Sequence, residues 1–268
     1  MLAFAHIEKT AGITINRILR RSFGVRHCDV EPWRGAWEAD FFSASDYRRL
    51  QRLYPRLESI AGHTVKPYSD LDQACSNIQY YTFLREPLLR CASHYQYQIQ
   101  VMRRNIPFED WIETEKFRNF QTTKIAGIAE LHIGIRVLQR FMFVGLVERF
   151  DESLVIFQRR AGDPCLSISY RRENVAPSNI IKNQLLSNPK TRAQLVEANR
   201  IDLAVYEFVS RDLYRREKRQ YGNTLDADVA AFKRTNSPPA FSLKLMLNVF
   251  RRNALYKPAL FYYRGFQT

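Results

Sequence analysis

The chain has 268 residues, enough for one sizeable α/β domain with its own core, and 46% of them are hydrophobic, as in ordinary soluble globular proteins. Lysines and arginines number 41 against 27 aspartates and glutamates, so the net charge is +14. This charge favours an anionic partner such as a nucleotide, a nucleic acid, an acidic glycan or a membrane surface, without choosing among them.

The four cysteines, Cys28, Cys75, Cys91 and Cys165, lie far apart and form no C-x-x-C pair. A zinc site needs clustered cysteines and histidines, so no metal is expected. Reduced thiols fit a cytosolic chain of this size, and two disulfides in an oxidising compartment stay open as the alternative.

Short apolar runs alternate with helical patterns along the chain. The expected elements of the first half are a strand at 2–7, a helix from 13 to about 24, a helix at 46–57, a strand at 59–61, a strand at 79–84 and a helix at 88–104. Those of the second half are helices at 108–120 and 131–140, a strand at 141–146, a helix at 148–160, an irregular stretch at 163–190 and one or two helices at 190–221.

This alternation predicts an α/β, P-loop-like three-layer fold, in which a central, mainly parallel sheet is flanked by helices. Residues 1–222 are expected to form that domain, and 223–268 a basic C-terminal appendage with an amphipathic helix near 241–256. Two interpretations of the appendage stay open. It is either a helix packed on the domain or a peripheral contact with a membrane surface or an acidic polymer.

The loop between the first strand and the first helix is a candidate anion site, because helix N-termini present free N–H groups and a favourable dipole. It supplies Lys9, Thr10, Ala11, Gly12, Ile13 and Thr14. Lys9 offers a mobile charge, the two threonines offer hydroxyl donors, and Gly12 allows close approach of the backbone. In this loop the lysine precedes the glycine and no earlier glycine is present, unlike in the Walker A pattern. The loop is therefore short and suits a monophosphate-like group rather than a triphosphate. An ordinary turn with a surface lysine is the alternative.

A second candidate is FLREPLLRCASHY, residues 83–95. Arg85 stands where the strand ends, and Ser93 follows eight residues later on the predicted helix. Arginine supplies a planar fork for a phosphate and serine a short donor. Arg90 and His94 are expected to add to the local positive field.

Taken together, HIEKTAGITINRIL, FLREPLLRCASHY and FVGLVERFDESL resemble the carbohydrate sulfotransferases that use 3′-phosphoadenosine 5′-phosphosulfate (PAPS). The closest branch contains the heparan sulfate and uronyl 2-O-sulfotransferases and their bacterial relatives. NFQTTKIAG at 119–127 and ANRIDLAVYEFVSRDL at 198–213 are similar to further segments of that family, so the likeness spans residues 4 to about 221. Each motif alone is weak, and their joint order and spacing make the resemblance fairly specific.

The resemblance implies that the Lys9 loop binds the 5′-phosphosulfate, with Lys9 steadying the leaving phosphate. It also implies that Arg85 and Ser93 hold the 3′-phosphate of the donor and of the product, 3′,5′-adenosine bisphosphate. His63, in IAGHTVKPY, stands where the branch has its general base, a usual role for histidine near neutral pH. A turn or capping role is the alternative for His63.

Two residues depart from the family pattern. Glu8 stands where proline is usual and Ile13 where threonine is usual, so Glu8 is expected to point away from the phosphosulfate. In the family, a loop late in the chain touches the 3′-phosphate of the donor. The resemblance therefore implies that Arg171 or Arg172 contacts this phosphate. A basic surface loop is the alternative for that segment.

The implied acceptor is a carbohydrate hydroxyl, and the positive charge suits an acidic polysaccharide or oligosaccharide. An ATP-using P-loop kinase and a catalytically inactive relative that binds anionic glycans remain alternatives, whereas no nucleic-acid motif is found. No secretory leader and no stretch near the ~20 apolar residues of a membrane span is visible. These features predict a cytoplasmic bacterial enzyme without a transmembrane segment, or a Golgi-lumen enzyme if an anchor has been trimmed.

Overall fold

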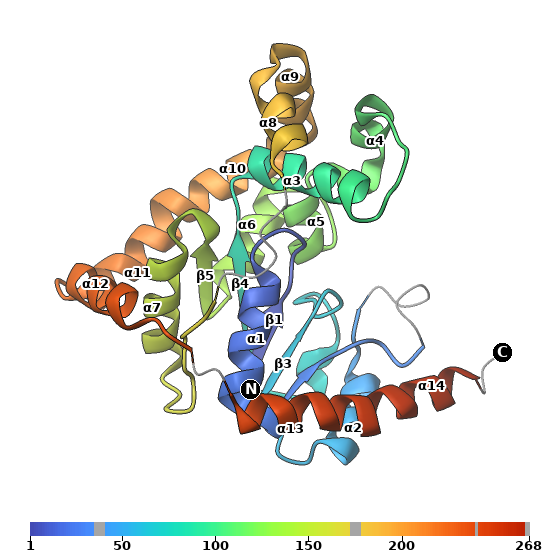
Figure 1. Cartoon of the computed structure of the whole chain (residues 1–268), viewed down its shortest axis with the longest axis vertical. Coiled ribbons are helices and arrows are strands. Elements are labelled where there is room, and N and C mark those ends of the chain that lie inside the picture. Colours follow the sequence, from blue (N-terminus) through green and yellow to red (C-terminus); the bar gives the residue numbers. More distant parts are fainter. Residues whose placement is uncertain (35–40, 172–177, 239–240, 266–268) are drawn as a thin grey trace.

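A five-stranded, fully parallel sheet forms the centre of the protein, in the order β2-β3-β1-β4-β5 (Figure 1). The computed structural model describes residues 1–34, 41–171, 178–238 and 241–265. The strands are β1 (Leu2–Ala5), β2 (His27–Asp29), β3 (Ser59–Gly62), β4 (Gln79–Leu84) and β5 (Phe143–Leu146). The expected parallel sheet flanked by helices is therefore confirmed, with β2 added because its three residues were too few for a recognisable pattern.

Successive side chains of β1 point to opposite faces of the sheet, and each face has its own core. Leu2 and Phe4 pack with α1 (Gly12–Phe23) and α7 (Phe150–Ala161) in the larger core. Ala3 packs in the smaller core, with side chains of α2 (Ala44–Leu53) and of the C-terminal helices. Helices thus cover both faces and make the three layers.

The middle of the chain differs from expectation in two places. The helix expected at 108–120 ends early, as α4 (Phe108–Glu113) followed by a 3-10 turn (Glu115–Phe117), and a further helix that was not expected, α5 (Phe120–Ala126), begins at residue 120. The stretch expected to be irregular contains α8 (Ile180–Ser187), whose short apolar pattern lies among prolines. The other helices of this region are α3 (Pro87–Gln100), α6 (Leu131–Gln139), α9 (Pro189–Ala198) and α10 (Arg200–Phe208).

Helices α5 and α10 cap one another, which fixes the start of α5. Asn119 takes a left-handed conformation with φ 42° before α5, and its Oδ1 accepts the N–H of Ile201 at 2.8 Å. In return, the carboxylate of Asp202 accepts the N–H groups of Gln121 and Thr122 at 2.9 and 2.8 Å, together with the Thr122 hydroxyl at 2.6 Å. The two motifs at 119–127 and 198–213 are thereby joined at one place.

We expect Asp202→Ala to lower the free energy of unfolding by about 3–5 kcal/mol, because it leaves buried donors without an acceptor. Asp202 is fully buried, so water cannot replace its oxygens. Urea denaturation measures the loss. Asp212→Ala, at an exposed position of the chain, is the matched control and should stay within about 0.5 kcal/mol of the parent. Equal stability of the two variants would contradict the capping role.

The C-terminal part consists of α11 (Tyr214–Tyr221), α12 (Leu225–Thr235), α13 (Leu243–Arg251), a π-helical segment η6 (Arg252–Tyr256) and α14 (Lys257–Gly265). Helix α12 packs on α7, and α13 packs on α1. The helix expected at 241–256 therefore extends to residue 265, continuing through η6. Across the described ranges, none of the helices combines the length and apolarity needed to cross a bilayer.

Candidate functional site

The carboxyl ends of three adjacent strands bring the predicted site residues to one edge of the sheet. Strand β1 lies between β3 and β4. The Lys9 loop follows β1, His63 follows β3 directly, and Arg85 follows β4 directly. Since the strands are parallel, the three segments meet at the edge where ligands bind in open α/β folds (Figure 1). Lys9 and Arg85, which are 76 residues apart in the sequence, are thus in direct contact.

The Lys9 loop has an unusual backbone. Lys9 and Ala11 adopt left-handed conformations, with φ of 71° and 64°. Such conformations cost about 1–3 kcal/mol for residues other than glycine and concentrate at functional sites. They form a concave row of N–H groups, and those of residues 9–13 have no acceptor among the described residues. Free N–H groups at such a turn are a suitable place for an anion.

Gly12 is needed at its position by a side chain of the protein itself. A Cβ atom there would lie 1.7 Å from Nε2 of His6. The His6 ring stacks on His63 with ring centroids 4.0 Å apart, and on Phe4 at 5.4 Å. The missing Cβ thus lets histidine rings pack directly beneath the anion loop, rather than only giving a ligand access to the backbone.

The two threonines of the loop differ in availability. Thr10 is fully buried and donates its hydroxyl proton to the carbonyl of Ile7 at 2.9 Å. The expectation that it offers a hydroxyl donor to a ligand is therefore wrong, because that proton holds the loop in shape. The Thr14 hydroxyl has no hydrogen-bond partner among the described residues, and the Ile13 side chain is exposed. Thr14 alone supplies a hydroxyl on this turn.

Three cations without a carboxylate partner gather beside the loop. Nη1 of Arg85 donates to the Lys9 carbonyl at 3.2 Å. Burial and the charge of Arg85 lower the pKa of Lys9, and the same two causes lower that of Lys182 on α8. None of the three forms an ion pair with a described residue. Glu148 and Glu86 offset part of the charge of Arg85. Positive charge without a direct ion pair in a partly desolvated place is typical of a site for an anion.

Arg85 is held by its main chain. Its N–H donates to Oε1 of Gln121 at 3.0 Å, and its carbonyl accepts from Nε2 of Gln121 at 2.8 Å. Gln121 is the residue whose own N–H is fixed by Asp202. The next N–H, of Glu86, donates to Oε1 of Glu148 at 2.9 Å. The guanidinium therefore extends from a fixed turn.

Ser93 is half-buried on α3 and has no hydrogen-bond partner among the described residues. Tyr97 follows it by one helical turn, and the ring of Tyr97 lies under Nζ of Lys9 with 4.6 Å to the centroid. The same helix therefore carries Ser93 and a residue that contacts the loop lysine, which places the serine on the side toward the loop. Its direct approach to Arg85 stays a prediction.

His63 is oriented by a hydrogen bond and a nearby carboxylate. Its Nδ1 lies 3.0 Å from the carbonyl oxygen of His6, which can only accept, so Nδ1 carries the proton and Nε2 bears the lone pair. Its side chain is 48% exposed, which leaves Nε2 accessible to an acceptor. Oε1 of Glu8 lies 3.6 Å from Nδ1 and 3.2 Å from Nζ of Lys124.

Glu8 therefore points toward His63 and Lys124. A carboxylate at this position of the motif was expected to point away from the phosphosulfate. Burial opposes its ionisation, but the charges of His63 and Lys124 and its hydrogen bonds outweigh burial and hold the pKa of Glu8 below its usual value. Lys124 in turn shields the loop from this carboxylate. Lys66 is buried and donates to the Lys124 carbonyl at 3.2 Å, so it packs inside rather than reaching toward an acidic acceptor.

The expected contribution of His94 to the positive field is wrong. Burial and the charge of Arg90 lower the pKa of His94 to about 3, so its ring is neutral. It lies between Nη1 of Arg90 and Nε2 of Gln98, at 3.2 Å from each. Arg90 is itself fully buried, with its guanidinium 4.4 Å from the centroid of the Phe120 ring. Both residues belong to the interior behind α3.

We expect stability to fall as the pH is lowered from about 6.5 toward 3, because burial also lowers the pKa of His6 to about 3. The folded pKa values of His6 and His94 lie below the ordinary 6.5, so only the unfolded chain takes up these protons in this interval. The loss at pH 5 is about 2 kcal/mol for each histidine. Urea denaturation of His94→Gln should show a shallower pH dependence, whereas the exposed His132→Gln should not. Identical slopes would contradict this cause.

Arg171 is exposed and makes no contact with the loop among the described residues, and Arg172 lies outside the described residues. Three residues that contact or charge the site were not predicted: Tyr97, Lys124 and Lys182. Tyr97 was detectable in principle, since it stands four residues after Ser93 on a predicted helix. Lys124 and Lys182 carried no signal, because only the packing of α5 and α8 brings them to this edge.

Comparison with known proteins adds little to this geometry. No protein family model matches the sequence. An uncharacterized protein of Archaeoglobus fulgidus is 24% identical over 253 residues, which cover 78% of this chain and 95% of the relative.

Proposed function

We propose that this protein transfers a sulfuryl group from PAPS to a hydroxyl of a carbohydrate acceptor. The observation that carries the proposal is the anion site at the carboxyl edge of the sheet. It combines a strained loop of free N–H groups with Lys9, Arg85 and Lys182. An accessible histidine with a lone pair on Nε2 stands beside it.

The arrangement suits a donor with two separate anionic ends. The N–H groups of the loop and the Lys9 ammonium would hold the 5′-phosphosulfate. Arg85, with Ser93 and Lys182 as neighbours, would hold the 3′-phosphate. Burial lowers the pKa of Arg85 and so disfavours its charge, which an anion beside it would offset. A short loop with a separate arginine matches this donor better than a linear triphosphate.

The reaction exchanges one sulfur–oxygen bond for another. The bond from sulfur to the phosphate oxygen breaks while the acceptor oxygen bonds to sulfur, and the hydroxyl proton passes to Nε2 of His63. Lys9 stabilises the negative charge that develops on the leaving phosphate. Glu8 stabilises the imidazolium that forms, from 3.6 Å away. The products are a sulfate ester and 3′,5′-adenosine bisphosphate.

The acceptor is proposed to be an acidic polysaccharide or oligosaccharide. The net charge of +14 would draw a polyanion to the surface and raise its local concentration. His63 is half exposed, so a glycan hydroxyl can approach its ring without being enclosed. A cytoplasmic location, where the donor is made in bacteria, belongs to the same proposal.

Two measurements test the proposal. Thermal unfolding with 3′,5′-adenosine bisphosphate at about 100 times its dissociation constant should show about 2.7 kcal/mol of stabilisation, with a smaller effect of ATP and Mg²⁺. Transfer of label from PAPS should then be screened over bacterial capsular and exopolysaccharide acceptors. Stabilisation by ATP and Mg²⁺ alone would replace the proposal by a kinase. Donor binding without transfer to any acceptor would indicate a binding protein.

A further inference from the structure

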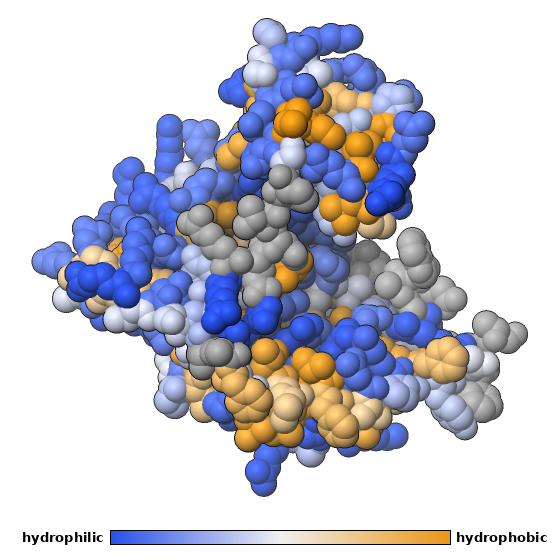
Figure 2. All heavy atoms as spheres, viewed as in Figure 1, coloured by the Kyte–Doolittle hydropathy of each residue, from blue (hydrophilic) through white to orange (hydrophobic). Residues whose placement is uncertain are grey.

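The C-terminal helices carry many exposed apolar side chains among the residues that the structure describes. Large hydrophobic side chains with at least two-fifths of their surface exposed number fifteen among the described residues, and nine of them lie within residues 241–262. Figure 2 shows apolar atoms gathered in one patch at the bottom of the molecule, over α13 and the start of α14. The nine side chains, called the apolar ridge below, are Phe241, Leu243, Met246, Leu247, Val249, Phe250, Leu255, Phe261 and Tyr262.

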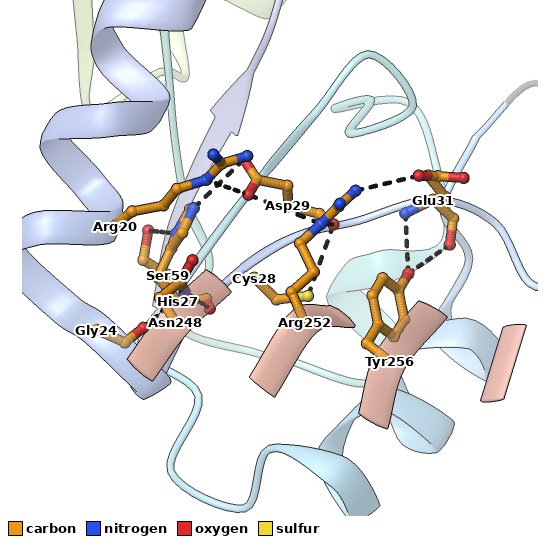
Figure 3. A network of polar contacts seen from close by, with 10 residues as sticks. All are labelled: Arg20, Gly24, His27, Cys28, Asp29, Glu31, Ser59, Asn248, Arg252 and Tyr256. Atoms are coloured by element: carbon orange, nitrogen blue, oxygen red, sulfur yellow. Dashed lines mark hydrogen bonds and ion pairs between the residues drawn. The ribbon is translucent and has the colours of Figure 1, made fainter. Parts of the chain in front are cut away.

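The opposite side of the same helices is fixed to the sheet domain. Nδ2 of Asn248 donates to the carbonyls of Gly24 and His27 at 2.8 and 2.7 Å. The Tyr256 hydroxyl donates to the Glu31 carbonyl at 2.8 Å and accepts the Glu31 N–H at 2.9 Å. Figure 3 shows these contacts together with Arg252, which bonds the Glu31 carboxylate at 3.2 Å. The ridge is therefore held outward and cannot turn into the core.

The surroundings of the ridge are basic. The sequence from 241 to 268 contains five lysines and arginines and no aspartate or glutamate. Helix α2 lies beside η6 and adds the exposed Arg48 and Arg52, followed by Arg56. The guanidinium of Arg49, also on α2, lies 4.5 Å from the centroid of the Tyr263 ring. An apolar surface with a cationic border is complementary to anionic headgroups over a hydrocarbon layer.

We propose that the apolar ridge docks the protein in the plane of an anionic phospholipid bilayer. The alternative occupant is a second copy of the chain, and charge argues against it. Each copy carries +14, and pairing two ridges would bring together two borders in which Arg252 and Arg264 share Glu31 while Arg48, Arg52 and Arg56 are exposed. A bilayer instead supplies negative charge at the border and hydrocarbon beneath the phenylalanines.

Docking through α13 would leave the Lys9 loop accessible. Helix α13 packs on α1 and on the turn after it, near the amino-terminal edge of the strands. The Lys9 loop, His63 and Arg85 stand at the carboxyl edge of the same sheet (Figure 1). Helix α13 thus lies at the edge opposite the anion site, whereas η6 and α14 continue along residues 31–33, which follow the carboxyl end of β2. The inference does not depend on sulfuryl transfer, and its failure would leave the proposed function intact.

Flotation of the full chain with vesicles tests the inference. The protein is expected to float with vesicles of phosphatidylcholine mixed with phosphatidylglycerol, to stay unbound with phosphatidylcholine alone, and to be released by salt. The double variant Phe250→Ser, Phe261→Ser should partition at least about tenfold more weakly, because two exposed rings no longer insert. Val101→Ser, at an exposed valine outside the ridge, is the matched control and should bind like the parent.

The double variant should keep the circular dichroism and thermal midpoint of the parent, since both phenylalanines are exposed. In a second measurement, Phe261→Trp should show a blue-shifted emission on adding anionic vesicles and quenching by brominated lipids. Equal binding by the double variant, or no quenching of the new tryptophan, overturns the inference. A dimer in sedimentation that the double variant dissociates, without vesicle binding, would assign the ridge to a second copy.

Discussion

Lys9→Ala is expected to lower kcat for transfer from PAPS by about 10²–10³-fold, because one donor to a developing anion is worth about 2.7–4 kcal/mol in a desolvated site. Lys9 forms no ion pair with a described residue, and burial lowers its pKa. Its charge is thus directed to a ligand rather than to the fold. Lys9→Arg should restore only part of the rate, because a planar guanidinium does not replace a point charge above the Tyr97 ring.

The matched control is Lys190→Ala, at an exposed lysine on α9. It should leave kcat and KM unchanged, and so separate the loss of a specific charge from the loss of one unit of net charge. Initial rates with labelled PAPS at saturating acceptor give both constants. Unchanged kcat in Lys9→Ala would remove the loop from the chemical step, whatever the donor affinity.

The sequence predicts the placement of Lys9, His63 and Arg85 better than it predicts their surroundings. Lys9, His63 and Arg85 each stand at the end of an apolar run, and parallel strands bring such ends to one edge. To predict that these residues meet, one needs to know only where the strands lie and that they are parallel. The contact between Arg85 and the Lys9 carbonyl is therefore a consequence of three short patterns.

The other motifs of the family resemblance contain residues whose structural roles cannot be read from the sequence. Gln121, Glu148 and Asp202 all belong to segments of the family resemblance. In the structure, Gln121 brackets the main chain of Arg85, Asp202 fixes the N–H of Gln121, and Glu148 accepts the N–H of Glu86. The three motifs thus position one arginine. Sequence spacing cannot reveal this, because the contacts join residues 36 to 81 positions apart.

Burial explains the expectations that failed. His94 and Thr10 have polar side chains beside candidate ligand groups, so the sequence offered them as partners of an anion. Packing places His94 in an interior where its ring is neutral, and turns the Thr10 hydroxyl back to the Ile7 carbonyl. Lys182 is the converse case, since α8 carries it to the neighbourhood of Arg85 from a segment without a recognisable pattern.

His63→Ala is expected to lower kcat by about 10²–10⁴-fold, the usual contribution of a positioned general base. Donor binding should persist, because the histidine stands beside the loop and contributes no charge to the phosphates. The exposed His132→Ala is the control. Thermal stabilisation by 3′,5′-adenosine bisphosphate should be equal in both variants and the parent, with only His63→Ala losing transfer. Full transfer by His63→Ala would require another base.

Glu8→Gln tests whether the Glu8 carboxylate acts on the proposed base, His63. The substitution keeps the length of the side chain and removes the charge that lies 3.6 Å from Nδ1 of His63 and 3.2 Å from Nζ of Lys124. The imidazolium formed during transfer then loses a stabilising carboxylate, so kcat should fall about tenfold while the ring stays fixed by the His6 carbonyl. In Glu8→Gln with His63→Ala, the first substitution should add no further loss, because its effect acts through the missing ring. Independent, multiplying losses would show that Glu8 acts on the donor loop instead.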